Sequence, residues 1–277
     1  MIKKKRRIKW KNVFLFTTII IFLIILIISI INISKWLIDD KKTKDQIIEV
    51  QENVIIEEIQ DSENTQIINN EESTDENNPY WTYVKMNLID VDFNQLKITN
   101  NEVVGWIQVN GTNINYPFVQ AKDNEFYLTH QFDKKYNSAG WLFLDYRNNK
   151  TEFDKNTIIY GHGRINNVMF GSLRKILTNG WLNNEENYVI KLSTETENTL
   201  WQVFSVYKIP TTSDYLQINF YSNENFLEFS NTLIKRSSYN FNTSINENDK
   251  ILTLSTCYNN DEKVVLHAKL IKLEKKS

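Results

Sequence analysis

The sequence is poor in the residues that carry most of the reactive chemistry of proteins. Its 277 residues include one cysteine, three histidines and seven glycines. A single cysteine excludes a disulfide bond within the chain. The sequence shows no cluster of metal-ligating residues, so we expect neither a metal nor another cofactor. The formal net charge of −2 gives no support to nucleic-acid binding.

The N-terminal region combines a basic cluster with a long run that carries no charge. Lysines and arginines crowd the first residues, and residues 13–33 ("VFLFTTIIIFLIILIISIINI") are as long as the roughly 20 residues of a membrane-crossing helix. The run exceeds the apolar core of a signal peptide and no small-residue cleavage site follows, which favours an uncleaved anchor over a cleaved signal peptide. The charges predict a cytoplasmic tail (1–12), a transmembrane anchor (13–33) and a domain outside the cell.

The segment after the apolar run has little to bury. Residues 39–79 contain no aromatic residue and no glycine and are rich in Glu, Asp and Asn. This composition predicts an extracytoplasmic linker over 34–79, with its most mobile part at 61–78. Such a linker would tether the following domain near the membrane.

Residues 80–277 have the pattern of one β-rich domain. Two short helices are predicted over 80–100, and two further helical patterns occur at 169–177 ("MFGSLRKIL") and 224–236 ("ENFLEFSNTLIKR"). In the second of these, Ser222 or Asn223 can serve as the N-cap. Many strands with few helices favour a closed barrel or a sandwich. Eight strands are predicted, over residues 103–109, 113–119, 141–145, 157–160, 188–193, 200–209, 251–257 and 263–273.

The cysteine ends the predicted strand "ILTLSTC". Because side chains alternate along a strand, Cys257 shares no face with Leu254. On the last strand Val264 marks the core side, so Lys263 and His267 point the other way. Pairing of these two strands would bring Cys257 and Lys263 together, off the core. A free cysteine is usually a small buried hydrophobic residue, but outside the cell an unpaired thiol favours a nucleophile.

A thiol with a pKa of about 8.5 needs a base or a cation nearby to become a nucleophile. His162 follows an apolar strand in "IIYGHGRINNVMFGSL" and is flanked by two of the seven glycines. These glycines permit unusual backbone angles and leave the ring open to approach. His130, in the loop-like "YLTHQFD", and His267, in mid-strand, are expected to be structural. His162 is therefore the favoured partner of Cys257.

Several segments resemble those of one enzyme family. "LTLSTC" resembles the TLxTC-type active-site strand of sortases, and "NTIIYGHGRINNVMFGSLRKI" is similar to the histidine segment of class B sortases. "VVGWIQVNGTNINYPFVQAKDNEFYLTHQF" and "SAGWLFLDYRNN" also resemble the class B pattern, in the expected order. The resemblance implies a mainly β fold: a closed eight-stranded sortase-type β-barrel with N-terminal helices and a helix between strands six and seven. It also implies a catalytic domain over 80–277.

The resemblance further implies a membrane-anchored cysteine transpeptidase. Cys257 would attack the Thr carbonyl of an NPxTx-like sorting signal in a secreted protein and form a thioacyl-enzyme. His162 would transfer protons, and an amine of the peptidoglycan would release the product. The implied partners are sorting-signal proteins, the wall amine and the membrane. The implied location is the surface of a Gram-positive cell, with the N-terminus inside.

One position departs from the family pattern. Sortases carry an arginine on the last strand that holds the substrate carbonyl and the oxyanion, and Lys263 takes the matching place in "DEKVVLHAKL". Lysine lacks the planar, forked guanidinium. Arg147, Arg164 and Arg236 are the alternatives for this role, although none lies on that strand. The exchange leaves a second interpretation open, a degenerate sortase that binds sorting signals with little or no turnover.

Two other classes of thiol enzyme are alternatives to the sortase interpretation. An L,D-transpeptidase keeps histidine and cysteine in one short motif, whereas here 94 residues separate His162 from Cys257. This spacing disfavours an L,D-transpeptidase. A hydrolytic cysteine protease differs only in its final acceptor, which is water instead of an amine.

Overall fold

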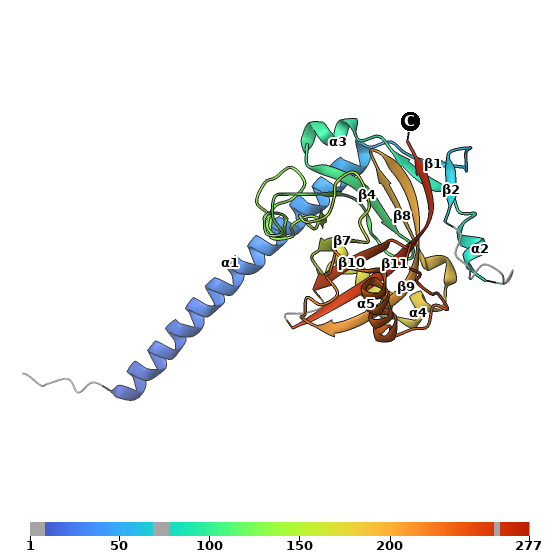
Figure 1. Ribbon diagram of the computed structural model, residues 1–277. Coiled ribbons are helices and arrows are strands. Elements are labelled where there is room, and N and C mark those ends of the chain that lie inside the picture. The colour runs from blue at the N-terminus through green and yellow to red at the C-terminus, as the bar shows by residue number, and fades with distance from the viewer. Residues whose placement is uncertain (1–8, 69–77, 258–260, 277) are drawn as a thin grey trace, which may run out of the picture. The chain divides into compact units, whose positions relative to one another are not determined.

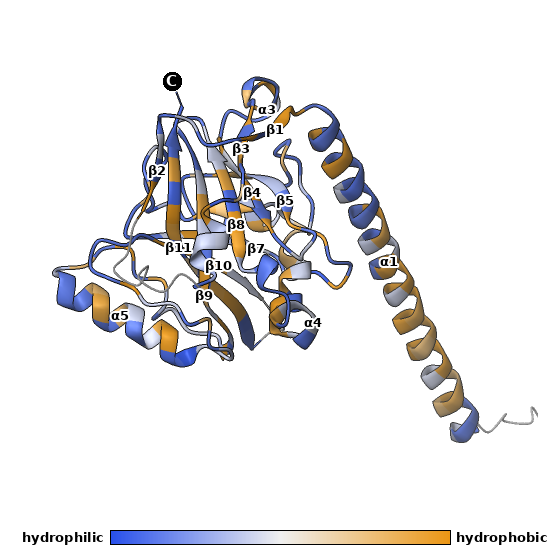
Figure 2. Cartoon of the chain, turned by 90° about the vertical axis from the view of Figure 1, so that its right-hand side faces the viewer, coloured by the Kyte–Doolittle hydropathy of each residue, from blue (hydrophilic) through white to orange (hydrophobic). Residues whose placement is uncertain are grey.

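The computed structural model describes residues 9–68, 78–257 and 261–276. The chain divides after Lys42 into two compact units. Helix α1 (Trp10–Glu52) is long and apolar enough to cross a membrane, and it contains the predicted anchor at 13–33. Hydrophobic residues dominate its N-terminal half, and charged residues become frequent towards its end (Figure 2).

Within the described residues of the second unit, eight strands form the closed barrel that the sequence predicts (Figure 1). Around the barrel the order is β4, β5, β6, β7, β10, β11, β9, β8 and back to β4. The β5–β6 and β7–β10 pairs are parallel and the others are antiparallel. The strands are β4 (Val103–Val109), β5 (Asn115–Val119), β6 (Phe143–Leu144), β7 (Asn156–Gly161), β8 (Val189–Thr194), β9 (Glu197–Pro210), β10 (Ile251–Cys257) and β11 (Glu262–Lys275).

The two helical patterns between strands form different kinds of helix. Helix α5 (Asn223–Arg236) lies between the sixth and seventh barrel strands, as predicted, and the Ser222 side chain caps it by accepting from the Asn225 N–H. The pattern at 169–177 instead forms a 3₁₀-helix, η3 (Phe170–Leu177). Its fully buried hydrophobic residues recur every third position, and a three-residue period is that of a 3₁₀-helix. They are Phe170, Leu173 and Ile176.

The region before the barrel contains more strands than predicted. Between helices α2 (Tyr80–Tyr83) and α3 (Asn94–Thr99) lies strand β3 (Leu88–Val91). It pairs with β1 (Ile56–Ile59), while β2 (Thr65–Ile67) pairs with the last part of β11. The structure thus places two strands in the range predicted as a linker. The remaining short helices are η2 (Phe126–Leu128), α4 (Asn179–Leu182) and η4 (Glu185–Asn187).

Ion pairs with barrel lysines hold this early segment. Lys191 Nζ lies 3.1 Å from a carboxylate oxygen of Glu58, and Lys272 Nζ binds Asp61. Lys272 is completely buried and also donates to the Met86 carbonyl at 2.8 Å. A buried ammonium group needs such partners. The bonds of Lys272 to Asp61 and to the Met86 carbonyl therefore stabilise the contact between the early segment and β11. Residues 69–77, within the stretch predicted as mobile, lie outside the described residues.

Both faces of the β10–β11 pair are buried. Leu254 and Val264 face the barrel interior, as predicted from alternation. The opposite face was predicted to lie off the core, and that prediction is wrong. Val265 belongs to a second hydrophobic cluster with Phe226 of α5, and His267 is completely buried. Helix α5 and the segment that precedes it supply the cover that strand alternation alone does not reveal.

Candidate active site

The end of β7 lies beside the end of β10. The two strands are parallel, and Gly161 pairs with Thr256 in the last position of their register. His162 and Cys257 directly follow these two residues. Neighbouring strands lie about 4.8 Å apart, so the register brings the chain at His162 close to the chain at Cys257. The Cys257 side chain itself lies outside what the structure describes.

Lys263 occupies the matching position on the other side of β10. In the antiparallel β10–β11 pair its backbone partner is Cys257. Residues directly opposite each other on antiparallel strands have Cβ atoms about 5 Å apart. The structure therefore confirms the predicted pairing of the two strands, and it places Cys257 opposite Lys263 and one residue beyond the Thr256–Gly161 pair.

A hydrogen bond orients the His162 ring. Its Nε2 lies 2.7 Å from the carbonyl oxygen of Leu128, in η2. A carbonyl oxygen only accepts, so Nε2 carries the proton, and in the neutral ring Nδ1 is left as the acceptor. Sequence reasoning missed this partner, because a backbone carbonyl has no side-chain signature.

The surroundings of His162 favour its neutral form. Burial lowers the pKa of the ring below its usual 6.5, and the nearby charges of Arg164 and Lys263 lower it further. The hydrogen bond to Leu128 acts in the opposite direction without cancelling these effects. At neutral pH the ring is accordingly available to accept a proton at Nδ1.

Gly161, beside His162, serves packing and not backbone freedom. Among the described glycines, positive φ angles occur at Gly111 and Gly140, at 70° and 60°. An added Cβ at Gly161 would lie 2.4 Å from Leu142 Cδ2 and 2.9 Å from the Phe170 ring. Gly161 therefore lets the end of β7 approach the start of η3, and the predicted reason, an unusual backbone angle, is wrong for this residue.

The other two histidines make structural contacts. His130 stacks on Phe126, with ring centroids 4.0 Å apart, and its Nδ1 lies 2.8 Å from the Phe126 carbonyl. His267 is buried between the Tyr207 hydroxyl at 2.8 Å and Thr253 Oγ1 at 2.9 Å. Of the three histidines, His162 is the one that follows a strand paired with the cysteine strand.

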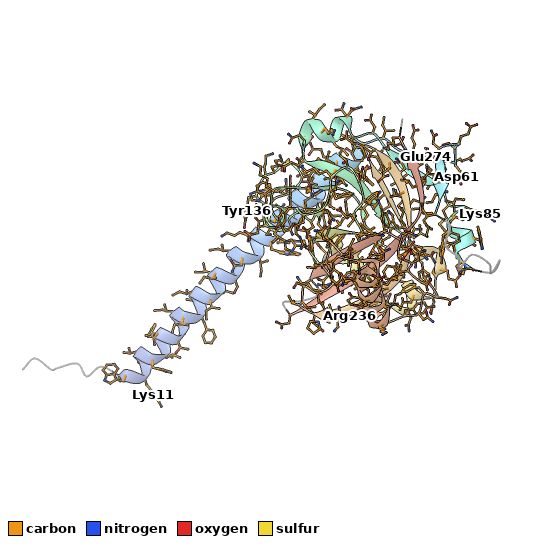
Figure 3. All side chains as sticks on the ribbon, in the orientation of Figure 1. Lys11, Asp61, Lys85, Tyr136, Arg236 and Glu274 are labelled. Atoms are coloured by element: carbon orange, nitrogen blue, oxygen red, sulfur yellow. The ribbon has the colours of Figure 1, made fainter. Side chains whose placement is uncertain are left out.

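Two of the arginines considered as substitutes for a last-strand arginine are bound to carboxylates. Arg147 donates from Nε and Nη2 to Asp145, at 2.9 and 2.7 Å. Arg236, near the end of α5 (Figure 3), binds both carboxylate oxygens of Asp214. Each of these guanidinium groups already has a carboxylate partner. The third arginine, Arg164, lies in the histidine segment.

The Asp145–Arg147 pair is part of a network beside the site. The carboxylate of Asp145 is fully buried and accepts from the Tyr160 hydroxyl at 2.9 Å. Burial alone would raise the pKa of Asp145, but hydrogen bonds from Arg147 and Tyr160 hold it below its usual range. Arg147 Nη2 also donates to the Leu216 carbonyl at 3.2 Å, which attaches the segment before α5 to the barrel. Tyr160 was not identified from the sequence. The signal that could have found it is strand alternation, because Tyr160 lies two residues before His162 and alternate residues of a strand share a face.

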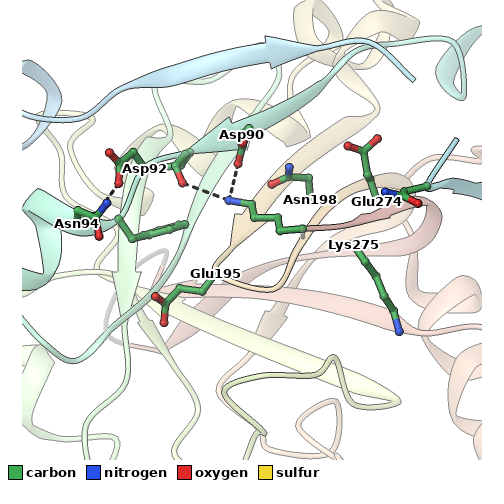
Figure 4. Close-up of a pocket in the computed structure, with 11 residues that line it drawn as sticks. Asp90, Asp92, Asn94, Glu195, Asn198, Glu274 and Lys275 are labelled. Atoms are coloured by element: carbon green, nitrogen blue, oxygen red, sulfur yellow. Dashed lines mark hydrogen bonds and ion pairs between the residues drawn. The ribbon is translucent and has the colours of Figure 1, made fainter. Parts of the chain in front are cut away.

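A polar hollow of about 400 Å³ occurs elsewhere on the domain (Figure 4). Asp90 and Glu274 line it, and Lys276 crosses it to bind Asp90 and the Val91 carbonyl. Glu274 lies near the end of β11, whereas Lys263 lies near its start. Their separation along the strand is roughly 35 Å, so this hollow is no part of the candidate active site.

Comparisons with known proteins agree with this geometry. Residues 107–271 match the family model of the sortase domain. Sortase B of Staphylococcus aureus is 32% identical over 185 residues, which cover 65% of this chain and 75% of the relative.

Solved structures agree as well. Sortase B from Bacillus anthracis aligns with a TM-score of 0.67 and 30% identity, covering 85% of this chain and 99% of that one. A complex of Staphylococcus aureus sortase B with its substrate aligns with a TM-score of 0.61 and 33% identity, covering 65% and 84%. The chain therefore belongs to the sortase family of cysteine transpeptidases, as a member of class B.

Proposed function

We propose that this chain is a membrane-anchored sortase that cleaves an NPxTx-like sorting signal and joins the threonine carboxyl group to a cell-wall amine. The observation that carries the proposal is the register of three strands. Thr256 pairs with Gly161 while Cys257 pairs with Lys263. This register gives a thiol, an imidazole and an ammonium group neighbouring positions at one end of the barrel.

In the first half-reaction Cys257 is the nucleophile. Its thiol proton passes to Nδ1 of His162 while Sγ bonds to the threonine carbonyl carbon. The carbonyl oxygen gains negative charge, and the Lys263 ammonium donates a hydrogen bond to it. The amide C–N bond then breaks, and the leaving amine takes the proton from His162. Throughout, Nε2–H stays bound to the Leu128 carbonyl, which keeps Nδ1 directed to the proton transfer.

The second half-reaction reverses the roles. An amine attacks the thioester carbon and gives a proton to Nδ1 of His162. The C–S bond breaks, the new amide is released, and the thiolate of Cys257 recovers its proton from the imidazolium. Water in place of the amine would give a free carboxylic acid instead.

The proposed partners follow from the fold and the family. Helix α1 has the length and composition of a membrane anchor, and its basic N-terminal flank favours a cytoplasmic N-terminus. The catalytic domain would then act outside a Gram-positive cell, on secreted proteins with a sorting signal and on a peptidoglycan amine. Protease treatment of intact protoplasts expressing the full chain tests this topology. Digestion of the catalytic domain is expected, and full protection would contradict the proposal.

The chemistry is tested by mass spectrometry of the protein incubated with NPxTx-like peptides. The wild type should gain the mass of the acyl fragment, and Cys257→Ala should gain none, because the chain has no other thiol. Added amines should then release a peptide–amine product from the wild type. An alanine variant that still acquires the acyl mass would exclude Cys257 as the nucleophile.

One observation favours a second candidate function. Lys263 offers a single-point donor where the family uses an arginine, which is compatible with a degenerate sortase that binds sorting signals without turnover. Binding of the peptide to the wild type, with neither acyl-enzyme nor product over hours, would support this alternative.

A further inference from the structure

We infer that the last turns of α1, residues 43–52, position the active site by fixing the loop that carries the Leu128 carbonyl. This carbonyl is the hydrogen-bond partner that orients the His162 ring. Thr43 and Gln46 act on the ring through the loop, so they are positioning residues. Their meaning in catalysis rests on the proposed function, but their effect on the ring can be measured without turnover.

The end of α1 is part of the folded domain. Residues 43–52 belong to the same compact unit as the barrel. Thr43 is completely buried, and Gln46, Ile47 and Val50 are buried as well. Their spacing of three, four and seven residues from Thr43 is that of one face of a helix. Ile47 and Val50 belong to the main hydrophobic core cluster. This face of the helix is therefore packed against the catalytic domain.

Two polar side chains of this face bind the loop formed by residues 126–137. Thr43 Oγ1 accepts a hydrogen bond from Asn137 Nδ2 at 3.0 Å, and Gln46 Oε1 accepts one from the Asp133 N–H at 3.3 Å. Asn137, like Thr43, is completely buried. A hydrogen bond in such low-dielectric surroundings is stronger than one in water. The helix end thus fixes the second half of the loop.

Asn137 carries this constraint to the first half of the loop. Its Nδ2 also donates to Gln131 Oε1 at 2.8 Å, and its backbone N–H donates to the Thr129 carbonyl at 2.8 Å. Thr129 directly follows Leu128. A displacement of Asn137 therefore displaces the peptide group next to the Leu128 carbonyl.

The Leu128 carbonyl is closely packed. Its oxygen lies 2.7 Å from His162 Nε2. Gly140, with a φ angle of 60°, lies so near that an added Cβ would be 2.9 Å from the same oxygen. Closely packed groups transmit a displacement instead of absorbing it. Because His162 follows β7 and not the loop, a shift of the loop changes the distance between Nε2 and the carbonyl.

This distance decides which nitrogen of His162 can accept a proton. A neutral imidazole carries its proton on either nitrogen, and the hydrogen bond at one nitrogen sets the tautomer. The Leu128 carbonyl holds the proton on Nε2 and leaves Nδ1 as the acceptor. With the proton on Nδ1 instead, that nitrogen could not take the proton of the Cys257 thiol. The helix end therefore secures the reactive tautomer.

The test uses the full-length protein in detergent micelles and the double variant Thr43→Val/Gln46→Met. Valine keeps the branched shape of threonine without its hydroxyl, and methionine has a helix propensity close to that of glutamine. Long-range ¹H–¹⁵N spectra of labelled histidine rings, assigned with His162→Gln, report the tautomer. The wild type should show His162 protonated on Nε2, and the double variant should show a mixture of both tautomers.

Turnover should change in the same variant. A misplacement of about 1 Å in a catalytic group can cost up to roughly 10²-fold in rate, so kcat should fall about 10-fold or more while KM changes little. Thr43→Ser restores a hydroxyl at the same position. It should retain the wild-type tautomer of His162.

Gln51→Ala is the matched control, because Gln51 Nε2 donates to the Asn115 carbonyl of β5 at 3.0 Å. The substitution removes a hydrogen bond between the same helix end and the barrel, outside the loop. It should leave the tautomer and kcat unchanged. An unchanged tautomer in a double variant that is folded by circular dichroism would overturn the inference, as would an equal change in the control. If the double variant fails to fold, the two single variants decide by the same readout.

The tautomer readout separates this inference from the proposed function. If the double variant shows mixed tautomers but the wild type forms no acyl-enzyme, the proposed transpeptidase activity is refuted. The positioning of His162 by the helix end would still stand.

Discussion

Cys257 and Lys263 are backbone partners across the antiparallel pair of β10 and β11. One residue earlier, Thr256 pairs with Gly161 on the opposite side of β10. Cys257 and Lys263 thus take their positions from hydrogen-bonded strands, and His162 directly follows the last paired residue of another strand. Sites built on such elements hold their geometry better than sites on loops. A substitution at one position should accordingly change the chemistry without displacing the others.

Substitution of Lys263 tests its proposed role as the oxyanion donor. Lys263→Ala should lower the acylation rate on the order of 10²-fold, the usual loss when one such donor is removed. Lys263→Arg should preserve or raise the rate, because a guanidinium can donate two parallel hydrogen bonds. Rapid-quench measurement of acyl-enzyme formation gives these rates, with folding checked by circular dichroism.

The arginines in carboxylate pairs are the controls for this prediction. If Lys263→Ala leaves the rate unchanged while Arg147→Ala or Arg236→Ala removes it, the lysine has no oxyanion role. If none of the forms turns over, the degenerate-sortase alternative is supported instead.

The lowered pKa of His162 predicts the acid side of the pH–rate profile. Burial first, and then the neighbouring cations, hold this pKa below 6.5. The neutral ring is the form that accepts the thiol proton, so kcat/KM should stay level from pH 8 to 7 and fall only below pH 6.5. His162→Ala should lower kcat by roughly 10²–10⁴-fold, the usual contribution of a general acid–base residue. An acid limb centred above pH 7 would contradict the assignment.

The sequence predicts the barrel well but not the segment before it. The predicted strands at 103–109 and 251–257 coincide with β4 and β10, because β4 is a mostly apolar run and β10 alternates apolar with hydroxyl-bearing residues. Strands β1 ("IEEI") and β2 ("TQI") have no such pattern. Their places depend on partners far away in the chain, such as Lys272 for Asp61. For this reason the composition of residues 34–79 predicts a linker, although β1 and β2 lie within this range.

The site shows the same division between local and distant signals. The strand parity and motifs around Cys257 and His162 are local, so they were visible in the sequence. The Leu128 carbonyl was not, because any residue carries a carbonyl and only the fold selects this one. Likewise three arginines were equal candidates by sequence. The fold shows that Arg147 and Arg236 are each bound to a carboxylate, of Asp145 and Asp214 respectively, and the sequence could not reveal these partners.

Two aspartate–arginine pairs with different burial predict different losses of stability. Asp145→Asn should lower the free energy of unfolding by about 2 kcal/mol, because the carboxylate is fully buried while its arginine is partly exposed. Asp214→Asn is the matched control, since both members of the Asp214–Arg236 pair are partly exposed. It should cost less than about 1 kcal/mol. Urea unfolding at pH 7.5 measures both, and equal losses would contradict the argument from burial.

The Asp145 variant should also affect substrate binding. Arg147 ties Asp145 to the Leu216 carbonyl in the segment before α5. Loss of the carboxylate loosens this tie near the site, so we expect KM for the sorting peptide to rise several-fold with kcat little changed. Steady-state kinetics of Asp145→Asn measures the split. A fall in kcat at constant KM would instead point to a role in the chemical steps.

The buried His267 predicts how stability depends on pH. Burial first, and the charge of Arg236 second, lower the pKa of this ring to about 3. Between pH 6.5 and 3 the unfolded chain binds a proton at this residue that the folded chain does not bind. The free energy of unfolding should therefore fall as the pH falls, by about 2 kcal/mol between pH 6.5 and 5 from this residue alone.

Two variants isolate the contribution of the His267 proton. His267→Gln removes the titrating group, so its free energy of unfolding should be lower than that of the wild type at pH 7.5 but should decline less steeply towards pH 5. Thr253→Val removes the hydroxyl that lies 2.9 Å from Nδ1 while leaving the ring in place. It should also be less stable at pH 7.5, yet it should keep the steep decline. Urea unfolding at pH 7.5, 6.5, 5.5 and 5.0 gives the three slopes. Equal slopes in the wild type and His267→Gln would mean that the ring takes up its proton within the folded domain, against the burial seen between β9, β10 and β11.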